Sequence, residues 1–211
     1  MMVLMHKLRL AVAASVALPL LALSPAAPWR DGAVSLPVAG PHEAHAAVSV
    51  LMSLEELVAA SSFVVVATAL DRESRWETIG GGRRIVTYTR LKVDRGVSGA
   101  APKEIVVRTL GGSVGKIGQQ VSGEAALSLG KPALLFLAKV DDALVVTGLA
   151  QGHYPVVTDG KGVTRLASSP DAGTLLPRRG PQIAAREVLV GATLDEGTQA
   201  VEKTRRALDG R

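Results

Sequence analysis

Between residues 63 and 166 the chain repeats short stretches rich in Val, Ile, Leu and Thr, which are separated by Gly- or Asp-containing turns. Branched side chains pack well on a pleated sheet, so these stretches predict β-strands. The run at 63–69 is apolar at nearly every position and predicts a strand buried on both faces. Residues 84–95 alternate apolar and polar residues and predict a half-solvated strand. Further strands are expected at 104–110, 133–138, 143–147, 154–158 and 163–166.

Two helices are predicted to frame these strands. Ser53 and Glu56 have the spacing of a capping box, in which each side chain accepts a hydrogen bond from the other residue's backbone N–H. They predict a helix from about Leu54 to Ala60. Thr193 and Glu196 repeat the device near the C-terminus, where the apolar face is weak. We expect this second helix to pack loosely or fray.

This pattern predicts a mainly β fold. About seven short strands with hairpin turns, preceded by one helix, indicate a small antiparallel barrel of the oligonucleotide/oligosaccharide-binding (OB-like) type. A β-sandwich is the alternative. The predicted barrel spans residues 47–167, with an N-terminal capping helix. A Pro-containing linker is expected at 168–192 and the C-terminal helix at 193–211.

Residues 1–46 are predicted to be a Sec-type signal peptide and spacer. Two basic residues precede an uncharged apolar run from Leu10 to Leu23, which is shorter than the roughly 20 residues of a membrane-spanning helix. Small residues allow cleavage after Ala26 or after Ala46. We therefore expect a secreted or periplasmic protein that does not span a membrane after processing.

The chain contains no cysteine. This excludes a disulfide scaffold, a thiolate metal site, a thiol nucleophile and a lipoprotein anchor. His153 has no second ligand at helical or strand spacing, and the acidic residues show no calcium-loop pattern. Neither a metal nor a cofactor is predicted.

Gly111-Gly112-Ser113-Val114-Gly115 matches the G-x-S-x-G string of serine hydrolases. In that fold the serine stands on a sharp turn between a strand and a helix. The residues that follow Ser113 are interrupted by glycine and show no helical period. A hydrolase using Ser113 is therefore only a secondary alternative, and no catalytic residue is predicted.

Candidate binding residues come from three regions: the hairpin expected at 72–95, the Gly-rich segment 111–123 and the stretch 151–154. The hairpin expected at 72–95 is rich in arginine and carries Trp76, and tryptophan and arginine are enriched at interface hot spots. The segment 111–123 is Gly-rich, which is typical of a mobile or ligand-facing loop. The predicted binding residues are Arg75, Trp76, Arg83, Arg84, Tyr88, Gln151, His153 and Tyr154, with Gly111, Gly112, Ser113 and Gly115 in the loop.

The isoelectric point of about 9.8 raises the question of nucleic-acid binding. Single-strand binding uses aromatic side chains for stacking, and the arginine-rich hairpin has only Trp76 and Tyr88. Acidic residues also interleave with its arginines. The predicted partner is an envelope or extracellular protein or an acidic glycan, and no nucleic acid.

Six short sequence segments follow one another along the chain: Ser53 to Leu57, Phe63 to Val66, Trp76, Gly111-Gly112, Gly130 to Leu137 and Gly148 to Val156. This order resembles a group of exported bacterial proteins of uncharacterised function with a netrin-like, metalloproteinase-inhibitor-type barrel. The resemblance implies an accessory or inhibitor of an exported protease as the alternative function. The inhibitory mechanism of that barrel uses a cysteine-rich N-terminus, which this chain lacks. The leading prediction is a non-catalytic binding module.

Overall fold

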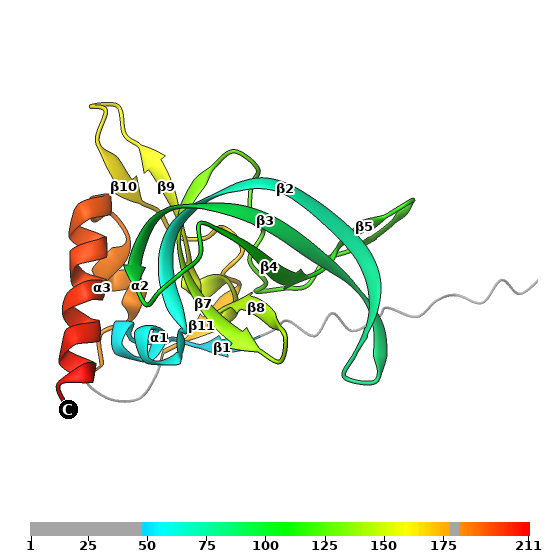
Figure 1. Ribbon diagram of the computed structural model, residues 1–211, viewed down its shortest axis with the longest axis horizontal. Coiled ribbons are helices and arrows are strands. Elements are labelled where there is room, and N and C mark those ends of the chain that lie inside the picture. The colour runs from blue at the N-terminus through cyan, green and yellow to red at the C-terminus, as the bar shows by residue number, and fades with distance from the viewer. Residues whose placement is uncertain (1–47, 178–181) are drawn as a thin grey trace, which may run out of the picture. The chain divides into compact units, whose positions relative to one another are not determined.

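The computed structural model describes residues 48–177 and 182–211 (Figure 1). They belong to one compact unit, residues 44–211. The predicted signal peptide and both cleavage sites lie outside the described residues. Among the helices of the two described ranges, none has the length and apolar character needed to cross a membrane.

The protein is mainly β, as predicted. Its main sheet has seven strands in the order β10-β9-β7-β2-β3-β4-β8. Their bounds are β2 Phe63–Ile79, β3 Gly82–Ser98, β4 Glu104–Leu110, β7 Pro132–Val140, β8 Ala143–Val146, β9 His153–Thr158 and β10 Thr164–Leu166. β8 also pairs antiparallel with β7, so the pairings from β7 through β2, β3, β4 and β8 return to β7. Because β4 meets β8 through one parallel pair, Val107 and Leu144, closure into a barrel stays a prediction.

β2 and β3 are the two longest strands, each of 17 residues. Figure 1 shows them curving side by side to a shared turn. Gly80 and Gly81 make this turn with positive φ angles, which glycine adopts at little cost. The register shifts between the two strands all lie between Val64 and Asp71, and the pairing is regular from there to Ile79. We call residues 71–90, which form the distal part of this hairpin, the arm.

Two apolar clusters lie on the two faces of the sheet. Val64 and Val66 of β2 belong to the cluster that includes Phe136 and the helices, whereas Val65 and Ala67 belong to the other. Successive side chains of a strand point to opposite faces, so an uninterrupted apolar run serves both clusters. This agrees with the predicted burial of 63–69 on both faces.

Both predicted helices are present, and both capping boxes form. They are α1 (Leu54–Ala60) and α3 (Leu194–Asp209). The expected loose packing of α3 is wrong, because Val201 is fully buried. Arg205 of α3 also donates hydrogen bonds to the carbonyl oxygens of Val58 (2.6 Å) and Ser61 (3.2 Å) and to Oγ of Ser98 (3.0 Å).

Residues 168–192, predicted as a linker, contain secondary structure that packs against the rest of the unit. β11 (Thr174–Leu176) pairs in parallel with β1 (Val48–Val50). The short helix α2 (Ala185–Leu189) buries Ala185 and Leu189. The prolines that suggested a linker separate these short elements and do not exclude them. The linker prediction therefore needs correction in the described part of this segment.

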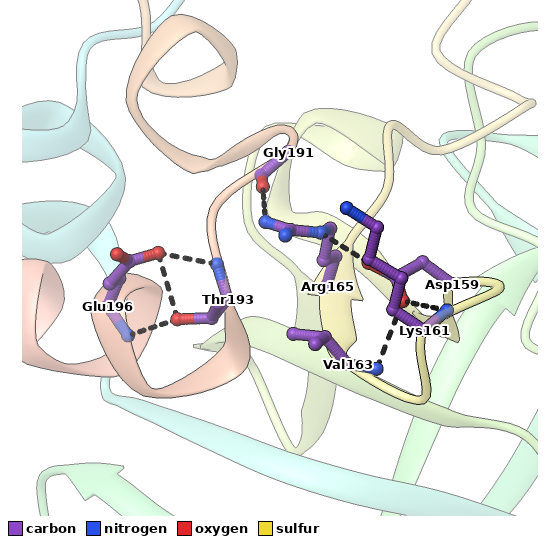
Figure 2. Close-up of polar contacts among 7 residues, drawn as sticks. All are labelled: Asp159, Lys161, Val163, Arg165, Gly191, Thr193 and Glu196. Atoms are coloured by element: carbon purple, nitrogen blue, oxygen red, sulfur yellow. Dashed lines mark hydrogen bonds and ion pairs between the residues drawn. The ribbon is translucent and has the colours of Figure 1, made fainter.

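The segment that leads into α3 is hydrogen-bonded to the β9–β10 hairpin, as Figure 2 shows. Arg165 donates to Oδ2 of Asp159 (2.9 Å) and to the carbonyl oxygen of Gly191 (2.9 Å). The backbone of Arg165 also bridges to Thr193, the N-cap of α3. Glu196 completes the cap by accepting from the backbone N–H of Thr193 (2.8 Å).

The docking of α3 through Arg205 gives a testable prediction. Replacing Arg205 with Met should lower the free energy of unfolding by about 2–3 kcal/mol, because the carbonyl groups of Val58 and Ser61 lose a charged donor. Urea denaturation measures the change. Arg206→Met is the matched control, since Arg206 is exposed and its side chain, among the described residues, bonds only to the carbonyl oxygen of Glu202 in its own helix. Equal midpoints for the two variants would show that Arg205 does not hold α3 in place.

Candidate functional site

A cleft of about 870 Å³ lies between the arm and the Gly-rich segment. One wall is formed by Thr87 and Thr89 of β3 and Thr109 of β4, whose side chains are buried. The other wall is formed by residues 110–113 and 118–127, and Asp171 also lines the cleft. We call this cavity the Gly-loop cleft.

The Gly-rich segment forms a short hairpin, and hydrogen bonds to Ile85 hold it against the arm. β5 (Gly112–Val114) and β6 (Ile117–Gln119) pair antiparallel, so the region predicted as a loop is partly a β-hairpin. The backbone N–H of Gly111 donates to the carbonyl oxygen of Ile85 (2.8 Å). In return, the N–H of Ile85 donates to Oε1 of Gln119 (2.7 Å).

Gly112 can only be glycine in this arrangement. Its φ of 124° lies in the region that disfavours other residues. A Cβ atom there would overlap the hydroxyls of Ser74 and Thr87, which are hydrogen-bonded to each other at 2.8 Å. Thr87 also donates to the carbonyl oxygen of Gly111 (2.7 Å). The close approach of the Gly-rich segment to the arm therefore depends on the missing side chain.

Four exposed polar side chains line the cleft without an internal partner. They are Arg72, Ser113, Gln120 and Ser122. Within the described ranges, none of these four makes a side-chain hydrogen bond or an ion pair. Together they offer a guanidinium, two hydroxyls and an amide to a ligand.

Glu124 is a buried carboxyl group in the wall of the cleft, and sequence reasoning missed it. Burial raises its pKa from 4.5 to about 7. Hydrogen bonds from the backbone N–H groups of Leu110 and Ala125, and the charge of Arg108, act in the opposite direction. Below pH 7 the group is therefore mostly protonated. A lone glutamate in an irregular Gly-rich segment gives no sequence signal of burial.

The predicted residues of the arm lie on its two opposite faces. Trp76 pairs with Ile85, which places it on the face that carries Thr87. The guanidinium carbon of Arg83 lies 5.0 Å from the centre of the Trp76 ring. These two residues therefore extend the cleft side of the arm.

Arg75, Arg84 and Tyr88 belong to the reverse face. The guanidinium carbon of Arg75 lies 4.3 Å from the centre of the Tyr88 ring. Glu77 accepts hydrogen bonds from Arg75 (2.8 Å) and from the Tyr88 hydroxyl (2.9 Å), and Arg84 pairs with it across the strands. The structure thus separates these residues from Trp76 and Arg83.

Gln151, His153 and Tyr154 lie away from the arm and make internal contacts. Gln151, in the short 3₁₀ helix η1 (Leu149–Gly152), accepts from the N–H of Met52 (3.0 Å) and donates to the carbonyl oxygen of Val50 (3.1 Å). Tyr154 is buried edge-on against Phe136, and this burial raises the pKa of its hydroxyl.

His153 is also buried, and its Nδ1 lies 3.1 Å from Oγ of Ser169. Burial lowers the pKa of the imidazole to about 4, against the opposing charge of Asp171. The ring is therefore neutral at physiological pH.

The G-x-S-x-G string does not form a nucleophile elbow. Ser113 lies on β5, and the next element is β6, not a helix. Ser113 lines the cleft, and His153 is not part of that lining. In the portion of the chain that is described, no three His, Asp or Glu residues are grouped as metal ligands.

No family model matches the sequence, and no curated protein is similar enough to count as a homologue.

The buried carboxyl group predicts how stability depends on pH. The native state keeps the Glu124 proton up to about pH 7, whereas an unfolded glutamate loses it near 4.5. This contribution is complete below pH 4.5 and is lost as the pH rises through 7, by roughly 3 kcal/mol in total. Glu124→Gln should therefore remove a fall in the free energy of unfolding between about pH 4.5 and pH 7.

Urea denaturation at a series of pH values measures this effect. Glu73→Gln is the control, because Glu73 is an exposed carboxylate on the arm. Titration of His153 occurs in both variants and cancels in the comparison. Identical pH profiles for Glu124→Gln and the unsubstituted protein would contradict the assigned pKa.

Proposed function

We propose that this protein is an exported, non-catalytic binding module whose partner is an acidic glycan or a protein of the cell envelope. The observation that carries the proposal is the Gly-loop cleft with its four unpartnered polar side chains. Its volume of about 870 Å³ lies in the usual range for small-ligand sites, about 300–1,000 Å³.

The chemistry of the lining favours the glycan of the two partner classes. Ser113, Gln120 and Ser122 can donate to and accept from sugar hydroxyls, and Arg72 matches a carboxylate or sulfate group. Below pH 7 the protonated Glu124 adds no repelling charge. Trp76 and Arg83, on the same side of the arm, add an aromatic ring and a second cation beyond the cleft.

We further propose that the five strands β2, β3, β4, β7 and β8 form an OB-like barrel. Their pairings follow a cycle, which supports this interpretation. OB-folds bind oligosaccharides and oligonucleotides on the face of their second and third strands. Those strands correspond here to β3 and β4, which contribute Thr87, Thr89 and Thr109 to the cleft.

Export and the lack of catalysis complete the proposal. The apolar leader within residues 1–46 supports export to the periplasm or beyond. The lack of a helix after Ser113, and the position of His153 outside the cleft lining, support a binding role over hydrolysis. The role as an accessory or inhibitor of a protease rests on the resemblance alone.

Binding to a soluble polyuronate tests the proposal. Isothermal titration calorimetry should show saturable binding, and Arg72→Gln should weaken it about fivefold, since it removes an exposed ion pair. Arg84→Gln is the matched control, because Arg84 lies on the reverse face of the arm. A neutral glucan of similar length should bind more weakly than the polyuronate.

Two results would reject this function. One is equal weakening by Arg72→Gln and Arg84→Gln, which would indicate attraction by net charge only. The other is unchanged recovery of partners from envelope extract with Trp76→Ala, which would remove the arm from the binding surface.

A further inference from the structure

A second cavity, of about 570 Å³, has a different character from the Gly-loop cleft. Its floor is formed by Ala67 and Ala69 of β2, Leu91 of β3, and Ala133 and Leu135 of β7, all of them buried. Three of these five residues are alanines, whose small side chains leave space over the sheet. We call this space the apolar cavity.

The walls of the apolar cavity are also mostly apolar. Leu127 and Pro170 lie between it and the Gly-loop cleft, since they line both. Pro155 and Val156 of β9 line another side. His153 reaches the cavity as a neutral ring, because burial lowers its pKa to about 4.

Among the described residues that line the apolar cavity, Lys131 is the one lysine or arginine, and no carboxylate is present. It lies at the solvent end, because its side chain is exposed whereas the floor is buried. Its ammonium group makes no hydrogen bond or ion pair with the described residues. An apolar interior with one unpaired cation at its entrance complements an amphiphilic anion.

Three exposed apolar residues lie next to residues of the cavity, in the chain or across a strand pair, and one of them, Val157, lines it. Leu129 pairs with Ala69 of the floor, and Leu70 follows Ala69 in the chain. Val157 lies across from Lys131, because Ala133 pairs with Pro155 in the antiparallel register of β7 and β9. Leu70, Leu129 and Val157 are 41%, 47% and 45% exposed. Val157 therefore adds exposed apolar surface to the lining of the cavity.

We propose that the apolar cavity binds a fatty acid, with the aliphatic chain over the alanine floor and the carboxylate on the ammonium group of Lys131. The cavity volume is within the range of small-molecule sites, about 300–1,000 Å³. This site is independent of the proposed glycan function, because Lys131 does not line the Gly-loop cleft.

Titration of the full chain with dodecanoate, below its micelle concentration, tests the site. Calorimetry should show saturable binding of one molecule per chain. Lys131→Gln should weaken binding about fivefold, the upper end for an exposed ion pair. Lys161→Gln is the matched control, since Lys161 is an exposed lysine in the β9–β10 turn that does not line the cavity.

A second variant tests the chain-binding part without altering the core. Thr164 is exposed and lines the apolar cavity, so Thr164→Trp should fill the entrance and abolish saturable binding. Thermal unfolding of each variant confirms that it is folded. Dodecanoate should not compete with the polyuronate, and Arg72→Gln should leave dodecanoate binding unchanged.

Three outcomes would overturn the inference: no saturable binding by the folded protein, equal affinities of Lys131→Gln and the unsubstituted chain, or retained binding by folded Thr164→Trp. Equal binding of dodecylamine would likewise contradict the role of Lys131. If the protein binds dodecanoate but does not bind the polyuronate, the proposed glycan function is rejected and the fatty-acid site is retained.

Discussion

The central position of β2 is the constraint on which the rest of the structure depends. It pairs with β3 from Val64 to Ile79, with register shifts near its start, and with β7 over residues 63–68. Its apolar run supplies Val64 and Val66 to the cluster under the helices and Val65 and Ala67 to the opposite cluster. A polar residue at any of these four positions would be buried without its hydration, so the run must stay apolar on both faces.

The candidate site exists because β2 and β3 continue past this core. Beyond Asp71 the two strands carry polar residues on the face that turns towards the Gly-rich segment. The hydroxyl pair of Ser74 and Thr87 leaves room only for a glycine at position 112. The cleft is therefore formed by two segments together. The arm provides one wall, and the Gly-rich hairpin, which packs against the arm, provides the other.

Local signals explain what could be predicted from the sequence. The strands and both capping boxes depend on residues close together in the chain, and they were predicted well. The burial of Glu124 and the docking of Arg205 depend on residues distant in sequence, so no local pattern reveals them. The separation of Arg75 from Trp76 could have been predicted, because neighbours in a strand point to opposite faces. The β11 and α2 elements were missed because each is very short and is stabilised by distant contacts.

The bonds of Arg205 also bear on how the chain is completed during synthesis. They join the last helix to the end of the first one across 147 residues, from Arg205 to Val58. Until position 205 has emerged, the carbonyl groups at the end of α1 lack their donor, and the apolar cluster beneath it lacks Val201. A nascent polypeptide that ends before this point lacks both contacts. Completion of this unit therefore depends on contacts between α1 and α3, which can form only once both helices have been synthesised.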